Sequence, residues 1–200
     1  NTNEPIVSTI VLTPTYTNNE ISCPGESKEF TITVNPSAQV NEIENIEICD
    51  GELTDLITFT TDNLGDLSVT TYSWVNDTPD VFGLGESGED TIDTFTAINT
   101  GTTPLTATIT VTPTYSNLGI DCLGEAETFT ITVHPGAQVN EIDNVFYCNG
   151  DLTELIEFTT SNEEGTTEYN WTNSNESIGL PATGIGNIEP FEIINTSTTA

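Results

Sequence analysis

Basic residues are nearly absent from this chain of 200 residues. Lys28 is its single lysine and it has no arginine, whereas aspartate and glutamate together number 32, so the formal net charge is −31. Nucleic acids, anionic membranes and heparin-like polymers are bound through lysine and arginine. The charge balance argues against all three partners and predicts a surface that keeps copies of the chain apart in solution.

Histidine is equally scarce, which argues against an enzyme. His134 is the single histidine and stands directly before Pro135. A Ser-His-Asp arrangement needs its histidine held rigidly beside a nucleophile, and one histidine beside a proline offers no such environment. The CxxC spacing expected of zinc or redox sites is also missing. Among 32 acidic residues, neighbouring carboxylates are expected by chance. We therefore predict no catalytic residues and no bound cofactor.

Helical periodicity and long apolar runs are missing too. Threonine instead alternates strictly with apolar residues, as in the segment 105–112 and again in 129–133. A period of two is typical of a strand with one face in a core and one in water. The chain is therefore predicted to be all-β.

The sequence repeats at a spacing of 99 residues. Residues 10–61 align without a gap on residues 109–160, and 32 of the 52 positions are identical. Trp74 recurs as Trp171 and Phe95 as Phe191 after short deletions. This period is too long for a solenoid unit and matches one complete small β domain. The segment 195–200 corresponds to 99–104, so the chain resembles a piece of a longer array.

One repeat is expected to be complete, with strands near 39–48, 55–61, 69–75, 91–98, 105–115 and 127–134 and a short extra strand around 80–84. Such strands, with a tryptophan in the third, predict an immunoglobulin-like β-sandwich with Trp74 in its core. We expect residues 1–36 to be the C-terminal strands of a truncated repeat, 37–135 a complete repeat, and 136–200 the N-terminal strands of another. Short linkers containing Pro36 and Pro135 would join them semi-rigidly.

Several motifs along the period resemble the PKD-like, immunoglobulin-like repeats of giant secreted surface proteins of Bacteroidota. They include a Cys-Asp/Asn-Gly turn at 49–51 and 148–150, a Phe-Thr strand at 59–60 and 158–159, and a Tyr-x-Trp strand at 72–74 and 169–171. The resemblance implies tandem β-sandwich modules of about 99 residues on the bacterial cell surface or secreted. It also implies that the protein is exported by the type 9 secretion route and is part of an adhesin of the kind associated with gliding motility.

That resemblance points to a non-catalytic stalk that spaces an adhesive tip from the cell, with neighbouring repeats as its partners. The alternative is that the repeats themselves bind a glycan, a surface or another filament. The candidate surface for such binding is a row of threonines, Thr106, Thr108, Thr110 and Thr112.

Calcium binding at the linkers is the alternative to a stalk that holds no ions. Hard cations take oxygen ligands from acidic and amide side chains. The acidic residues that recur just past each linker are Glu42 and Glu44, then Glu141 and Asp143. An ion held there would fix the angle between modules. The competing interpretation is that these charges decorate an exposed strand edge and prevent aggregation.

The four cysteines, in a protein of this apparent class, predict disulfides. Within the complete repeat the available pair is Cys49 with Cys122, which we favour. One rival pairs Cys23 with Cys49 and Cys122 with Cys148. Another joins the first cysteine of one module to the second cysteine of the next, and a seven-strand topology would favour it.

Asp90-Thr91-Ile92 matches the short pattern that Bacteroidota use for O-glycosylation, with Thr91 as the acceptor. The competing interpretation is a loop that leads into a strand.

Overall fold

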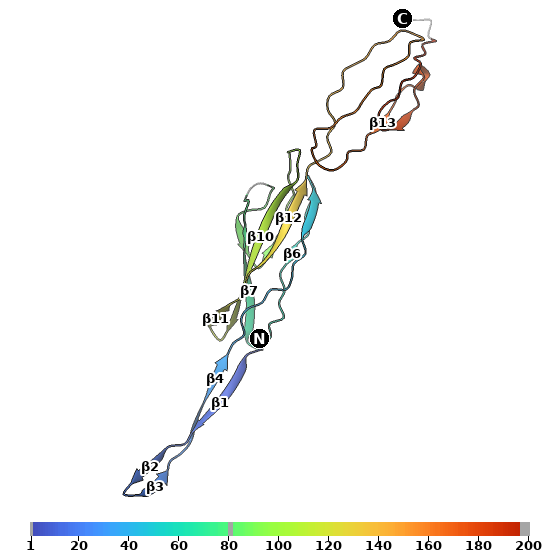
Figure 1. Cartoon of the computed structure of the whole chain (residues 1–200). Coiled ribbons are helices and arrows are strands. Elements are labelled where there is room, and N and C mark those ends of the chain that lie inside the picture. The colour runs from blue at the N-terminus through green and yellow to red at the C-terminus, as the bar shows by residue number, and fades with distance from the viewer. Residues whose placement is uncertain (1, 80–81, 197–200) are drawn as a thin grey trace.

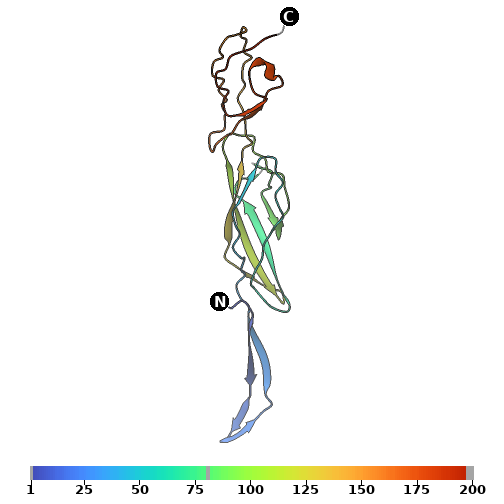
Figure 2. The ribbon, with the colours of Figure 1, turned by 90° about the vertical axis from the view of Figure 1, so that its right-hand side faces the viewer.

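The computed structural model describes residues 2–79 and 82–196, and these residues contain strands but no α-helix. Their one helical element is a 3₁₀ turn, η1 (Glu176–Ile178). Figures 1 and 2 show an elongated molecule with three parts stacked end to end. A narrow N-terminal hairpin lies at one end, a two-layered middle part follows, and a C-terminal part with little regular strand lies at the other end.

The middle part is built on one large sheet. Its strand order is β5-β12-β10-β7-β8, and a further strand, β11, pairs with β10. Every pairing is antiparallel except that of β5 with β12. The strands are β5 (Ile46–Cys49), β7 (Ser68–Asn76), β8 (Ser87–Glu89), β10 (Leu105–Asn117), β11 (Ile120–Leu123) and β12 (Glu127–His134).

Strand β10 is the centre of this sheet because three strands pair with it. Its first half pairs with β12, from Leu105 opposite Val133 to Val111 opposite Glu127. Its second half pairs with β11, and β7 runs along its other edge. The alternating pattern seen in the sequence places Ala107, Ile109 and Val111 on the buried face, each fully buried.

The second layer is thinner and covers that buried face. It consists of β6 (Ile57–Thr58) paired with β9 (Thr91–Ile92), extended by a single bridge between Leu53 and Thr96. The core lies between the layers and includes Trp74, which is 6% exposed as the sequence predicted. The Trp74 indole N–H donates a hydrogen bond of 3.0 Å to the carbonyl of Thr91 and so joins the two layers.

The outer parts repeat the sequence of the middle part without its burial. The N-terminal part pairs β1 (Ile6–Leu12) with β4 (Lys28–Val34), and β2 (Thr15–Asn18) with β3 (Ile21–Pro24). Phe30 is 53% exposed, whereas its counterpart Phe129 is 1% exposed. In the C-terminal part, Val139 is 59% exposed and its counterpart Val40 only 9%. That part contains β13 (Asn170–Thr172) and β14 (Thr183–Ile185), which pair.

The expected strands are found to different extents. The segments 69–75, 105–115 and 127–134 are strands almost at the predicted bounds. The segments 39–48, 55–61 and 91–98 contain only β5, β6 and β9, because most of their length makes single bridges or isolated backbone hydrogen bonds. The extra strand expected at 80–84 is wrong for residues 82–84, and residues 80–81 lie outside the described part. The short strand in this region is β8, which begins a few residues later at Ser87.

Gly88 provides a test of the core. It pairs with Trp74 across the sheet, and a Cβ atom at Gly88 would lie 2.6 Å from the indole ring. We expect Gly88→Ala to lower the free energy of unfolding by about 1–3 kcal/mol, because the buried ring has to move. Urea unfolding followed by tryptophan fluorescence measures this.

The matched control is Gly85→Ala in the same segment, where a Cβ would meet no atom within 4 Å. Equal midpoints for the two variants would contradict the tight packing of Trp74 against β8.

Candidate functional site

Two short segments connect the three parts, residues 35–38 (the first connection) and residues 134–137 (the second connection). One backbone hydrogen bond recurs beside both. The Leu64 N–H donates to the Asn3 carbonyl at 2.8 Å, and the Glu163 N–H donates to the Thr102 carbonyl at 3.0 Å. Each donor and each acceptor is 99 residues from its counterpart. The two connections therefore share a contact between successive parts of the chain.

Each connection is also held by one asparagine side chain. Asn63 Oδ1 accepts from the Gln39 N–H at 2.7 Å, and its Nδ2 donates to the Ser37 carbonyl at 3.1 Å. Asn162 makes the same pair of contacts at the second connection, with Gln138 at 3.0 Å and Gly136 at 3.2 Å.

A threonine two residues earlier orients each asparagine, since the Thr61 and Thr160 hydroxyls donate to the Oδ1 atoms. These asparagines were not predicted from the sequence. The recurring Thr-x-Asn at 61–63 and 160–162 was the signal that could have found them.

The hairpin formed by the end of β10 and β11 spans the first connection. Its Tyr115 hydroxyl donates to the Leu64 carbonyl at 3.0 Å, and its Asn117 amide donates to Asn35 Oδ1 at 2.8 Å. Gly124, just after β11, packs directly against the carbonyl of Ala38, where a larger residue would collide. The hairpin thus meets the end of the preceding part of the chain.

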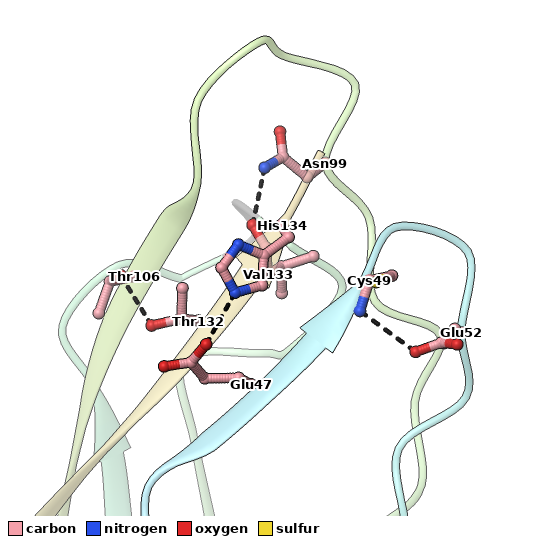
Figure 3. A network of polar contacts seen from close by, with 8 residues as sticks. All are labelled: Glu47, Cys49, Glu52, Asn99, Thr106, Thr132, Val133 and His134. Carbon is pink, nitrogen blue, oxygen red and sulfur yellow. Dashed lines mark hydrogen bonds and ion pairs between the residues drawn. The ribbon is translucent and has the colours of Figure 1, made fainter. Parts of the chain in front are cut away.

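The opposite end of the middle part carries a polar network beside the second connection (Figure 3). The Cys49 N–H donates to the Glu52 carboxylate at 3.2 Å, and Asp50 Oδ1 accepts from the Asn99 N–H at 2.6 Å. His134 Nε2 lies 2.9 Å from Glu47 Oε2, an ion pair when the imidazole is protonated.

The C-terminal part repeats the turn of this network. The Cys148 N–H donates to Asp151, and the Asn195 N–H donates to Asn149 Oδ1. The turn after Cys49 is therefore hydrogen-bonded to Asn99, and the turn after Cys148 is hydrogen-bonded to Asn195 in the same way.

All four cysteines are free thiols in the structure. Cys49 pairs with His134 at one end of the sheet, whereas Cys122 pairs with Tyr115 at the other. Ten residues of β10 separate those ends, or about 30 Å at 3.3 Å per residue. A disulfide needs Cα atoms within about 7 Å, so the favoured Cys49–Cys122 bond is wrong.

The rival pairings between Cys23 and Cys49 and between Cys122 and Cys148 fail for the same reason. Cys23 lies in the hairpin of β2 and β3 at the far tip of the N-terminal part (Figure 1), a full part away from Cys49. Cys148 lies in the C-terminal part beyond the second connection, at the opposite end from the hairpin that holds Cys122.

The candidate calcium ligands do not gather into a site. Glu42 and Glu44 are exposed on the segment before β5, and Glu141 and Asp143 are exposed at the equivalent place. Among residues 2–79 and 82–196, no group of three or more acidic, histidine or cysteine side chains could hold a metal ion. The neighbouring Asn41 is instead hydrogen-bonded to Thr60.

Thr91, the predicted glycosylation acceptor, is half-buried in β9 opposite Thr58. The preceding Asp90 has a φ of 60° and its carboxylate accepts from the Tyr72 N–H at 3.0 Å. The Asp-Thr pair therefore joins the two layers, and its glycosylation stays a prediction.

The threonine row lies on the outer face of β10. The Thr106 hydroxyl is 2.9 Å from that of Thr132 on β12, so these two hydroxyls bind each other. Beside the row, the Thr108 N–H donates to Asp77 at 2.8 Å, and this bond lowers the pKa of the Asp77 carboxyl below its ordinary value of 3.8. On the core side of β7, burial raises the pKa of the Tyr72 hydroxyl above 10.0.

Comparison with known families identifies a PKD-like domain at residues 47–137. The match begins at the second residue of β5 and runs through β12 to the end of the second connection. PKD-like domains are typical of extracellular repeat proteins and are generally non-catalytic. No curated protein matches the chain. The residues described by the structure contain no helix long and apolar enough to cross a membrane.

The asparagine at the first connection can be tested directly. Asn63→Ala leaves the Gln39 N–H and the Ser37 carbonyl without their partner. We expect a loss of about 1–3 kcal/mol in the free energy of unfolding, because a half-buried polar group then lacks its hydrogen bond. Amide hydrogen exchange at Gln39 should become faster.

The exposed Asn144 supplies the control, and Asn144→Ala should leave both quantities unchanged. Unaltered exchange at Gln39 in the Asn63 variant would show that the connection is held by other contacts.

Proposed function

We propose that the chain is a non-catalytic stalk segment of a long extracellular repeat protein, which holds an adhesive tip away from a bacterial cell. The observation that carries the proposal is the recurrence of the same backbone hydrogen bond at both connections. A spacer has to keep a constant geometry from one module to the next, and a contact between backbone groups does so whatever the side chains are.

The exposed apolar residues of the outer parts support the same proposal. Phe30 and Ile32 of β4 are 53% and 49% exposed, while their counterparts Phe129 and Ile131 are buried in the middle part. We take residues 1–36 and 136–200 as portions of modules like 37–135. In a continuing array each would bury these residues against the remaining strands of its own module, which favours folding by the hydrophobic effect.

The charge of the chain suits an extended array. A net charge of −31 is spread along an elongated molecule with one lysine and no arginine. Because like charges repel, bending one module back onto another costs free energy at low salt. Screening over about 8 Å at physiological ionic strength leaves the connections themselves to set the direction of the rod.

The partners in this proposal are the neighbouring repeats of the same chain. Export by the type 9 route and a role in gliding stay predictions from the resemblance. Binding of a glycan or another filament stays a prediction from the threonine row, and binding of calcium one from the recurring acidic residues. A protein of this composition needs no cofactor to act as a spacer.

Small-angle scattering on chains of increasing length tests the stalk. One, two or three copies of residues 37–135 are inserted after Pro135, and the maximum dimension of each chain is measured. We expect it to grow linearly by about 35–45 Å per copy, the length of a ten-residue strand and its turns. Growth that falls off with copy number would show that the modules fold back on one another and would contradict the stalk.

A further inference from the structure

Cys49 and Cys122 occupy the two ends of the middle part, and each lies where another part of the chain meets it. Cys49 is exposed beside the second connection, and Cys122 is half-buried in the hairpin that spans the first connection. Two cysteines that cannot reach each other within one module are thus both at the contacts between modules. The question is which group each would face in a continuing array.

The hairpin at the first connection shows what Cys122 faces. Cross-strand partners in an antiparallel pair lie on the same face, and so do residues two apart. Because Tyr115 pairs with Cys122, and Asn117 pairs with Ile120, the side chains of Cys122 and Asn117 project from the same face of the hairpin. Asn117 donates to Asn35, at the end of the preceding part. Cys122 therefore faces that same end.

The second connection shows what stands beside the position of Asn35. The counterpart of Asn35, one period later, is His134, and His134 pairs with Cys49 in the parallel register of β12 and β5. Glu47 binds His134 on the outer face of the sheet (Figure 3). Cys49 lies two residues after Glu47 in β5, so it belongs to the same face of that strand. In a longer array, the hairpin of the next module would approach His134 in the way that Asn117 approaches Asn35. The cysteine of that hairpin would then lie beside Cys49.

A second set of contacts leads to the same pair. Gly124, two residues after Cys122, packs against Ala38 of the first connection. The counterpart of Ala38 is Ala137, which follows Gly136, and a Cβ atom on Gly136 would lie 3.6 Å from a carboxylate oxygen of Asp50. Asp50 follows Cys49 directly. The hairpin of the following part thus packs against the first connection, and the cysteine turn of the preceding part lies beside the equivalent residues of the second connection.

We infer that a disulfide crosses each connection of the array and joins Cys49 of one module to the cysteine equivalent to Cys122 in the next module. The inference rests on the proposed array, because the two cysteines belong to successive modules. Each module then takes part in two bonds, one at each end. The array becomes a chain in which every connection is closed covalently as well as by hydrogen bonds.

The bond forms by thiol–disulfide exchange with an oxidant such as oxidised glutathione. The Cys49 thiolate, after losing its proton, attacks one glutathione sulfur and releases one glutathione thiolate. The second cysteine, as its thiolate, then attacks the Cys49 sulfur of the mixed disulfide and releases the other glutathione thiolate. The two cysteines lose two electrons and two protons in total, and the oxidant gains them as two molecules of reduced glutathione.

The test uses the chain with one inserted copy of residues 37–135, in which Cys23 and Cys148 are replaced by serine. Three versions each keep two cysteines of the duplicated part. The forward version keeps Cys49 in the first copy and Cys122 in the second. The reverse version keeps Cys122 in the first copy and Cys49 in the second. The third keeps both cysteines in the first copy.

Oxidised glutathione is added to each folded chain, and intact mass and free-thiol titration follow the intramolecular bond. We expect the forward version to lose both thiols at least about tenfold faster than the other two, because only there are the cysteines held at high effective concentration. An equal rate in all three versions, or faster closure of the reverse or third version, would overturn the inference.

Scattering by chains with one, two or three inserted copies, with every cysteine replaced by serine, separates the two proposals. Linear growth in length without a forward bond would refute the disulfide and leave the stalk. A forward bond in a chain whose length does not grow would refute the stalk geometry. Urea unfolding of each version before oxidation shows that the middle part is folded in all of them.

Discussion

The length of strand β10 is the constraint on which the remaining structure depends. It runs for 13 residues, Leu105–Asn117, whereas its partner β12 pairs only with the first seven. The first half fills the core of its own sandwich. The second half, paired with β11, projects beyond that core and contacts the preceding part of the chain. One continuous strand therefore both organises the middle part and contacts the part that precedes it.

Several hydrogen bonds hold the two connections. A proline at 36 or 135 restricts one backbone angle and removes one donor. The asparagine at 63 or 162 fixes two backbone groups of the connection at once, and Asn117 of the hairpin also binds Asn35 of the first connection. Bending at a connection would have to break several of these contacts together. For the proposed spacer, such resistance would matter more than affinity for a ligand.

The sequence predicted the all-β class and the three main strands because strict alternation marks a strand with one buried face. It predicted the second layer poorly. Ile57 and Ile92 are core residues as their pattern implies, but they belong to strands of two residues. Alternation reports which side chains are buried, whereas strand assignment depends on backbone pairing, and an irregular segment can bury the same side chains without a continuous ladder.

The cysteine prediction failed for a topological reason. Composition and spacing assigned Cys49 and Cys122 to one repeat, and both lie within the PKD-like match at residues 47–137. Their separation depends on β5 running parallel to β12, which puts Cys49 at the far end of the sheet from β11. No local pattern encodes that direction. The asparagines of the connections were missed because a side chain that binds a backbone two dozen residues away leaves only a short recurring motif.

The backbone hydrogen bond shared by the two connections has a geometric consequence for an array. Leucine and glutamate supply its donor, and asparagine and threonine its acceptor, so modules can diverge in sequence while the contact persists. Any object placed after its neighbour by one fixed rotation and translation traces a helix, and a head-to-tail contact that does not close gives an open one. Equivalent faces of successive modules would then point outward at regular angles around a common axis.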